Sequence, residues 1–284
     1  MSLGSGLGIH KINIINSYRG ILDELGIYDS FVLGIADKKL TGKFKDEWAE
    51  LKRLDDGEEK WFGFDKDGNI PWSEITTWRG SSDVLVKQKN NQGKNALSYP
   101  AYQNTSSLMP KIVSSGINQT NGMLFDGSND YMIIDKYSGI DIKTPPFSSY
   151  ITCPTCKYGH IFSVNGIAFF DNQYMFRLEA SGNAVYFYIG EQTRIVNAVL
   201  TFNQHSIWSW EGYDANQLTV KNSNGEVNGI QDVPLVSKAN VRIGCRLGGG
   251  TGTPENHFNG TIKNILIFNS NQKSNYNNFV NGGI

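Results

Sequence analysis

Short apolar segments separated by turns fill the sequence after Gly122, and this regularity constrains the fold more than any other feature. About a dozen such segments, rich in β-branched and aromatic residues, alternate with Gly, Asn or Asp clusters as far as Phe268. Strands at this spacing are typical of a two-sheet sandwich. Between Phe125 and Tyr131, the turn-forming residues Asp126–Asn129 indicate a hairpin that sets strand register at the sandwich edge. We therefore predict an all-β fold.

Composition narrows the classes of protein that remain. Hydrophobic residues make up 39% of the 284 positions and charged residues 19%, which is enough apolar material for a sizeable core. A net charge of -1 argues against binding to nucleic acid or to a charged membrane surface. No segment approaches the ~20 consecutive apolar residues of a membrane span. The three cysteines and the absence of a visible leader indicate folding in a reducing cytosol.

The region before Gly122 differs in character from the strand series. Residues 1–16 are rich in Gly and carry Ile9, Ile12, Ile14 and Ile15, which we interpret as an arm that docks elsewhere. A short helix is predicted from Ser17 to Gly26. A second helix is predicted from Asp29, with Phe31, Val32, Ile35 and Ala36 on one face.

Further along, the pattern predicts a hairpin over 51–64 that turns at Asp55–Gly57, followed by a helix that begins at Pro71 and ends at Gly80. Residues 87–121 are polar and long for a loop within a compact domain. One turn of helix is predicted within 274–284. The expected organisation is a docking arm at 1–26 and a sandwich at 27–284. The sandwich divides into an N-terminal part at 27–121 and a jelly-roll core at 122–284.

Three ordered segments resemble the laminin-G-like, concanavalin A-like jelly rolls. They read "MLFDGSNDYMII" at 123–134, "HSIWSWEGYDANQLTVKNSNGE" from His205, and "VRIGCRLGGGTGTPENHFNGTIKNILIFN" from Val241. The first and last resemble the opening and closing strands of that family, and the middle one resembles its central hairpin. This resemblance implies a concanavalin A-like two-sheet jelly-roll sandwich with a few short helices near the N-terminus.

The upstream segments resemble a narrower group. "LGIADKKLTGKF", "LKRLDDGEEKWFGFDKDGNIPW", "TWRGSSDVLV" and "PKIVSSG" are similar to a module of bacteriophage structural proteins that is related to the catalytic domain of fungal-type arabinofuranosidases. In that module a Trp-Tyr-Asp-Gln-Ser-Gly motif follows the last strand before the polar loop. Here Val86–Asn91 stand in its place, without the Trp, the Asp or the Gly. This departure argues against an inherited active site.

The candidate chemistry is sparse. Glycoside hydrolysis requires two facing carboxyl groups, and neither Glu179, Glu191 nor Glu211 can be paired with an Asp by spacing alone. Cys153 and Cys156, with His160 and Cys245, offer half of a zinc site, but a second Cys-x-x-Cys is missing. The segment 65–69 resembles part of a calcium loop with the Gly misplaced, so a plain turn is favoured. We expect neither a metal nor a cofactor.

Sugar binding has the better candidates. Asn90, Asn91, Gln92, Tyr99 and Tyr102 in the polar loop combine hydrogen-bonding groups with aromatic rings, and we take them as a candidate carbohydrate site. Trp208 and Trp210 share one face of their strand and could also contact a sugar, but core packing is the favoured role.

These patterns favour a non-enzymatic bacteriophage virion protein, such as a head or tail fibre or a capsid decoration protein, assembled in the host cytoplasm. Its arm, with Ile9, Ile12, Ile14 and Ile15, would bind other virion proteins. Its jelly roll would bind host-surface glycans, and it would form a homo-oligomer such as a trimer. The alternative is an arabinofuranosidase-like glycoside hydrolase. A bacterial surface adhesin is disfavoured because no signal peptide is visible.

Overall fold

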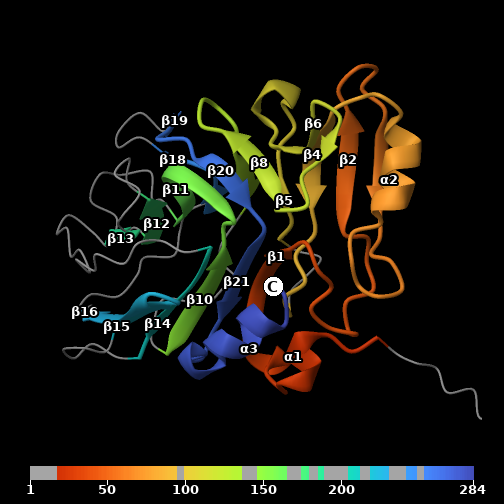
Figure 1. Cartoon of the computed structure of the whole chain (residues 1–284). Coiled ribbons are helices and arrows are strands. Elements are labelled where there is room, and N and C mark those ends of the chain that lie inside the picture. The colour runs from red at the N-terminus through yellow and green to blue at the C-terminus, as the bar shows by residue number, and fades with distance from the viewer. Residues whose placement is uncertain are drawn as a thin grey trace, which may run out of the picture.

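The chain folds into two large β-sheets that pack face to face, with short helices at their margins (Figure 1). The computed structural model describes residues 18–94, 99–135, 146–164, 174–178, 185–188, 204–211, 218–229, 241–247 and 253–284. The expected all-β sandwich with a few short helices is confirmed.

The smaller sheet joins the beginning of the chain to its end. Its strands are antiparallel and run in the order β1 (Phe31–Ala36), β21 (Asn264–Phe268), β10 (Phe147–Thr152), β14 (His205–Trp210), β15 (Leu218–Asn222) and β16 (Gly225–Gly229). Successive side chains of β21 point to opposite faces of the sheet, as in any strand, and they enter two different cores. Ile265 and Ile267 belong to the main core between the sheets, whereas Leu266 and Phe268 belong to a second core on the outer face.

The larger sheet takes most of its strands from the middle of the chain. Its path runs through β3 (Glu59–Phe62), β2 (Ala49–Arg53), β4 (Val84–Lys89), β5 (Ala101–Tyr102), β9 (Met132–Ile134), β17 (Val241–Ile243), β11 (Thr155–Val164), β20 (Asn259–Ile262), β8 (Met123–Asp126), β6 (Lys111–Ser114) and β7 (Ile117–Asn118). β12 (Tyr174–Leu178) and β13 (Val185–Tyr188) extend it beside β11. β4 and β6, which lie near opposite ends of this strand order, also pair with each other. β18 (Arg246–Leu247) and β19 (Pro254–Glu255) form a separate ribbon.

Three short helices lie outside the sheets: α1 (Ile21–Glu24), α2 (Trp72–Arg79) and α3 (Tyr276–Asn281). Turns of 3₁₀ helix occur at Tyr28–Ser30, Ser106–Leu108 and Lys273–Asn275. Helices α1 and α3 lie close together against the smaller sheet (Figure 1), where Leu22, Phe279 and Ile284 are buried in the second core. Residues 18–26, which the sequence assigns to the docking arm, therefore pack against the body of the fold.

Strand β1 corrects the helix predicted from Asp29. All of its residues are buried, and Phe31 and Ile35 pair with Phe268 and Ile265 of β21. A Cβ at Gly34 would lie 2.0 Å from the Phe31 ring, so only glycine lets this ring fold back over the strand. The spacing of the apolar residues resembles one face of a helix. A short and fully buried apolar segment fits a strand equally well, and the pairing with β21 makes this segment a strand.

The long polar loop predicted over 87–121 is also corrected. β4 continues to Lys89, and β5, β6 and β7 all lie within this segment. Ile112 and Val113 enter the main core, which a purely polar reading of the segment does not anticipate. The predicted hairpin with its turn at Asp55–Gly57, the helix after Pro71 and the C-terminal helix are confirmed by β2–β3, α2 and α3.

The residues after β4 hold the free edge of β1. Asn91 Oδ1 accepts hydrogen bonds from the main-chain N–H groups of Gly34 at 2.7 Å and Gly93 at 2.8 Å. The main-chain N–H of Gln92 donates to the Gly34 carbonyl at 2.8 Å, and that of Lys94 donates to the Phe31 carbonyl at 3.0 Å. This segment therefore supplies the partners that an edge strand would otherwise expose.

A buried ion pair lies beside this contact. Lys89, at the end of β4, donates to Asp37, directly after β1, and both side chains are almost completely buried. The pair therefore joins a strand of the larger sheet to a strand of the smaller one.

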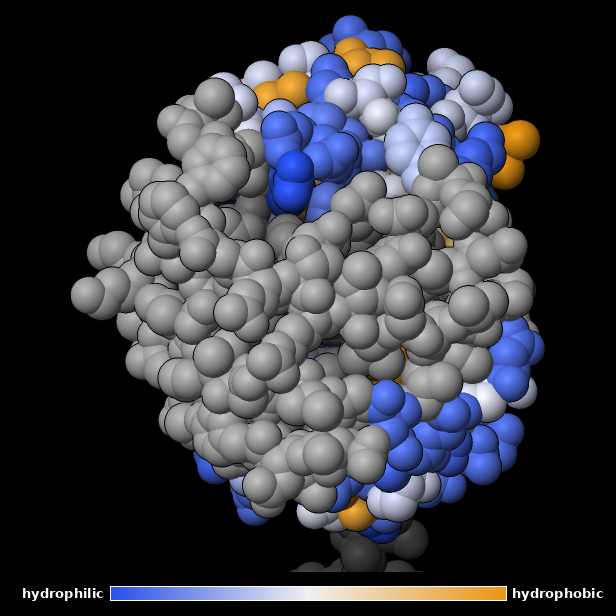
Figure 2. Space-filling model, turned by 90° about the vertical axis from the view of Figure 1, so that its left-hand side faces the viewer, coloured by the Kyte–Doolittle hydropathy of each residue, from blue (hydrophilic) through white to orange (hydrophobic). Residues whose placement is uncertain are grey.

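The described surface visible in Figure 2 is mostly hydrophilic, and its hydrophobic residues form small separate spots. Among the residues that the structure describes, no helix has the length and apolar character that crossing a membrane requires.

We predict that Asn91→Ala lowers the free energy of unfolding by about 2–4 kcal/mol, because the N–H groups of Gly34 and Gly93 lose their shared acceptor in the interior. Chemical denaturation measures this change. Asn121→Ala, at an exposed position, is the control and should stay within about 0.5 kcal/mol of the original protein. Equal stability of the two variants would contradict the role given to Asn91.

Candidate functional site

The residues predicted to bind sugar do not share one surface. Asn91 and Gln92 are buried, and Gln92 both accepts from the Leu40 N–H and donates to the Lys38 carbonyl, each at 2.9 Å. Asn90 is half-buried and donates to the Glu47 carbonyl at 2.9 Å. Asn91 and Gln92 are therefore committed to the main chain around β1.

The two tyrosines of that prediction make different contacts from the three amide side chains. Tyr99 is half-buried against the main core, and the hydroxyl of Tyr102 donates to Asp135. Sugar binding through Asn90, Tyr99 and Tyr102 stays a prediction. The proposed docking residues Ile9, Ile12, Ile14 and Ile15 lie outside the described residues.

A pocket of about 290 Å³ opens where β4, β6 and β8 lie side by side. Met123 and Phe125 of β8 point into the main core, so Leu124 and Asp126 of the same strand face the opposite side and line the pocket. Asp130, from the turn after β8, completes this wall. The other lining residues come from β4, β6 and the loops beside them: Leu54, Leu85, Ser106, Ser107, Met109, Lys111 and Ser114.

The turn that follows β8 fixes both carboxyl groups. Asp126 Oδ1 accepts the main-chain N–H groups of Ser128 at 2.7 Å and Asn129 at 3.2 Å. Asp130 Oδ2 accepts the main-chain N–H of Asp126 at 3.1 Å. Gly127 between them has a φ of 81°, which favours glycine. The turn predicted as architecture therefore also places two aspartates in one pocket.

The two aspartates differ in environment. Asp126 is exposed, whereas Asp130 is buried. Burial and, to a smaller extent, the negative charge of Asp126 raise the pKa of Asp130 to about 7, against the opposing effects of the hydrogen bond from the Asp126 main chain and the charge of Lys111. At weakly acidic pH Asp130 is therefore protonated and can donate a hydrogen bond or a proton. A carboxyl group with a pKa near 7 beside a second carboxyl group is typical of sites that use general acid catalysis.

The sequence pattern favoured an architectural role for the turn that carries Asp126 and Asp130, and not a catalytic one. Two aspartates spaced four apart across a glycine turn were visible, but the same pattern serves equally well as a plain turn. The pocket that holds both aspartates is also lined by Leu85 and by residues from 106–111, which are distant in sequence and meet Asp130 only in the folded chain.

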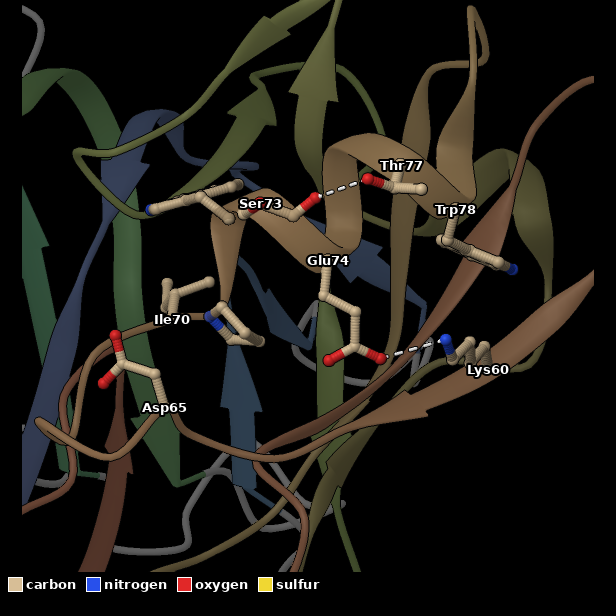
Figure 3. A pocket seen from close by; sticks show the side chains of 9 residues that line it. Lys60, Asp65, Ile70, Ser73, Glu74, Thr77 and Trp78 are labelled. Carbon is tan, nitrogen blue, oxygen red and sulfur yellow. Dashed lines mark hydrogen bonds and ion pairs between the residues drawn. The ribbon is translucent and has the colours of Figure 1, made fainter.

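A second and larger hollow lies beside α2. This α2 groove has a volume of about 770 Å³ and is lined by Lys60, Asp65, Ile70, Pro71, Trp72, Ser73, Glu74, Thr77 and Trp78. In Figure 3, Glu74 extends from α2 toward Lys60 of β3, with which it forms an ion pair at 3.0 Å. Thr77 donates to the Ser73 carbonyl at 3.0 Å within the helix.

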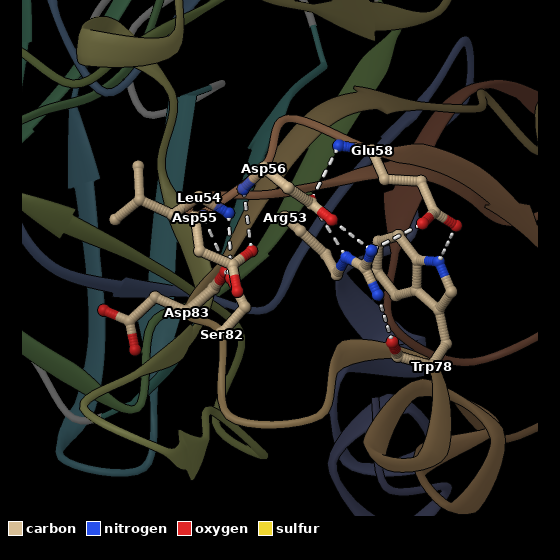
Figure 4. A network of polar contacts seen from close by, with 8 residues as sticks. All are labelled: Arg53, Leu54, Asp55, Asp56, Glu58, Trp78, Ser82 and Asp83. Atoms are coloured by element: carbon tan, nitrogen blue, oxygen red, sulfur yellow. Dashed lines mark hydrogen bonds and ion pairs between the residues drawn. The ribbon is translucent and has the colours of Figure 1, made fainter.

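Polar contacts fix one wall of the α2 groove (Figure 4). The indole N–H of Trp78 donates to Glu58 at 2.7 Å, and Arg53 donates to the Trp78 carbonyl at 2.8 Å. The Arg53 guanidinium also lies 5.5 Å from the centre of the Trp78 ring, and the same arginine pairs with Asp56 and Glu58. Trp78 therefore has one preferred orientation.

The metal candidates remain ordinary structural residues in the described part of the chain. Asp65 Oδ1 accepts the N–H groups of Asp67 and Asn69, which makes 65–69 a plain turn. Cys153 and Cys245 are buried thiols, and burial raises the pKa of Cys245 to about 12. Within the described residues, no group of three or more His, Cys, Asp or Glu side chains is placed to hold a metal ion.

The remaining candidates are placed only in part. Trp208 is buried in the main core, which confirms its predicted packing role. Glu211 is exposed and accepts from Asn271 at 2.6 Å, as a surface residue would. Glu179, Glu191 and the side chain of Trp210 lie outside what the structure describes.

No protein-family model matches the sequence, and no curated protein matches it. Solved structures do share the fold. One is an arabinofuranosidase complexed with arabinofuranosyl-alpha-1,2-xylobiose, with a TM-score of 0.67 and 12% identity over 93% of this chain. Another is a mutant GH54 a-l-arabinofuranosidase soaked with 4-nitrophenyl a-l-arabinofuranoside, with a TM-score of 0.63 and 12% identity over 92% of this chain. A third, a GH54 a-l-arabinofuranosidase soaked with a cyclic sulfate inhibitor, has a TM-score of 0.65 and 12% identity over 92%.

These likenesses correct the expectation of a non-enzymatic protein, because all three of these solved structures, which match more than nine-tenths of the chain, are of arabinofuranosidases. The virion role, the docking partners, the oligomer and the location in a virion stay predictions. This chain spans 64% of the length of each of the three solved chains. At 12% identity, the likeness establishes a sandwich fold shared with arabinofuranosidases.

Proposed function

We propose that the protein is a glycoside hydrolase that removes arabinofuranosyl units, with the Asp126–Asp130 pocket as its active site. The observation that carries the proposal is that a buried and an exposed aspartate, Asp130 and Asp126, line one pocket, where burial raises the pKa of Asp130 to about 7. The fold supports it, because three solved structures that share it are of arabinofuranosidases. The alternative drawn from the sequence thus becomes the leading function.

Each aspartate has a defined role in this proposal. When the bond between the anomeric carbon and the leaving oxygen breaks, the leaving oxygen takes the proton of Asp130. The carboxylate of Asp126 stabilises the positive charge that develops on the sugar ring. Water then supplies the hydroxyl group of the released sugar, and the proton that water loses restores Asp130. The reaction consumes one water molecule and leaves both aspartates unchanged.

The other lining residues suit a single small sugar. The volume of about 290 Å³ lies near the lower end of the common range for ligand pockets, roughly 300–1,000 Å³. Ser106, Ser107 and Lys111 supply hydrogen-bonding groups for ring hydroxyls. Leu85 and Leu124 supply apolar surface, which keeps water away from Asp130 and is consistent with its raised pKa.

We predict that the protein hydrolyses 4-nitrophenyl and methyl α-L-arabinofuranoside. Asp130→Asn should lower kcat on the methyl glycoside at least about 100-fold, because its poor leaving oxygen loses its proton donor, and should affect the nitrophenyl glycoside less, because nitrophenolate leaves without a proton. Release of nitrophenol or of arabinose measures the rate. Asp67→Asn, at an exposed position outside the pocket, is the matched control and should keep the original activity. The rate on the methyl glycoside should fall as pH rises through about 7, where Asp130 loses its proton.

Inactivity of the original protein over a panel of aryl glycosides would refute the proposed reaction. Full activity of Asp130→Asn on the methyl glycoside would refute the role of Asp130 even if the protein is a hydrolase.

The proton of Asp130 can also be tested without any substrate. Its pKa in the folded chain lies above the ordinary 3.8, so the folded state binds this proton more tightly than the unfolded state. The stability that it contributes is complete below about pH 4 and is lost as pH rises to about 7. Asp130→Asn cannot titrate, so its stability relative to the original protein should increase by about 2–3 kcal/mol between pH 5 and pH 8.

Urea denaturation at these two pH values measures the difference. The Asp67→Asn control should show no such change. A pH-independent difference between Asp130→Asn and the original protein would mean that Asp130 is already ionised at pH 5.

A further inference from the structure

The α2 groove continues into a second, smaller hollow. This Asp37 recess has a volume of about 170 Å³ and is lined by Asp37, Lys38, Asn69, Ile70, Trp72, Thr120, Lys263 and Gly283. Ile70 and Trp72 line both hollows, so the α2 groove and the Asp37 recess adjoin at these two side chains. Two adjoining hollows offer room for a larger molecule than the Asp37 recess alone.

Aromatic side chains form rigid walls of the groove. Trp72 is half-buried and packs against the main core, and Trp78 is fixed by Glu58 and Arg53. Side chains that are already immobilised lose little conformational entropy when a ligand binds. Flat apolar faces of this kind pack well against the C–H faces of sugar rings, which present apolar patches between their hydroxyl groups.

The polar groups of the groove favour a neutral ligand. Lys60 is paired with Glu74, so its positive charge is offset, and Asp65 adds a negative charge. The Asp37 recess adds Lys38, Lys263 and Asp37, so the two hollows together are lined by three lysines and three carboxyl groups, and an acidic polymer would meet no net surplus of positive charge. The carboxylate oxygens of Glu74 and Asp65 can accept hydrogen bonds from hydroxyl groups, which a neutral polyhydroxylated molecule supplies in number.

The recess contains an acceptor that lacks a partner. Asp37 Oδ1 is bound by Lys89, but its Oδ2 is buried and has no hydrogen-bond partner among the described residues. Burial raises the pKa of Asp37 and lowers that of Lys89, against the attraction between the two charges. An unsatisfied buried oxygen costs free energy unless a ligand or water binds it. A ligand hydroxyl in the recess would satisfy Oδ2.

We propose that the α2 groove and the Asp37 recess together bind a neutral glycan chain, with Trp72 as the shared contact and Asp37 Oδ2 accepting a hydroxyl group. The site is separate from the Asp126–Asp130 pocket, since the two share no lining residue. The choice of a glycan as ligand rests on the proposed function.

Affinity electrophoresis tests the proposal with three soluble probes: a neutral arabinose-substituted xylan, a neutral β-glucan and anionic polygalacturonate. The xylan should slow the original protein and polygalacturonate should not. Trp72→Ala should bind the xylan at least about tenfold more weakly, because it removes the aromatic wall. Glu74→Gln, a milder exposed change that tests the same groove without touching the core, should weaken binding roughly threefold or more.

Trp61→Ala is the matched control, because Trp61 is 38% exposed on β3 but lines neither hollow. It should bind like the original protein. The proposal is overturned if neither neutral polymer binds, or if Trp72→Ala and Glu74→Gln both bind like the original. Turnover of the aryl arabinofuranoside reports on the pocket alone. Glycan binding without turnover would therefore refute the proposed hydrolase activity and support the proposed glycan site. Turnover without glycan binding would support the hydrolase activity and refute the glycan site.

Discussion

The structure depends above all on how strand β1 is held. One edge of β1 pairs with β21, and the other is bound by the main chain and side chains of residues 91–94. Directly after β1, Asp37 meets Lys89 from β4 in a buried ion pair. These contacts tie the smaller sheet to the larger one. Removing one partner of a buried pair leaves an uncompensated charge, so Asp37 and Lys89 constrain each other's substitution.

This arrangement also decides where ligands can reach. The polar residues after β4 are committed to β1, so the hollows form elsewhere: beside β8 on the outer face of the larger sheet, and beside α2. Asp37 contributes to both features, because its Oδ1 binds Lys89 and the same residue lines the recess. A single carboxyl group thus connects the framework of the fold with the proposed glycan site.

Local patterns in the sequence predicted most of the fold. The turn at Asp55–Gly57, the helix after Pro71 and the sandwich itself all follow from short-range signals. The hairpin predicted at Asp126–Asn129 is wrong: the turn exists, but β8 pairs with β20 and β6 while β9 pairs with β17 and β5, so the two strands that the turn joins are not neighbours in the sheet. Strand β1 was predicted as a helix because its identity depends on β21, more than 200 residues away. Amide side chains at Asn91 and Gln92 look the same in a sequence whether they meet a sugar or a buried main chain. The raised pKa of Asp130 likewise depends on burial by distant segments.

The pairing of β1 with β21 has a consequence for the order in which the chain can fold. Phe31 and Phe268 are neighbours in the sheet, yet almost the whole chain separates them. During synthesis, at about 5–20 residues per second, β1 leaves the ribosome well before its partner exists. Until then this apolar strand has no sheet to enter, and such a segment is prone to pair with other chains. The smaller sheet is therefore completed last, and folding of the newly made protein is limited by the arrival of its C-terminal strand.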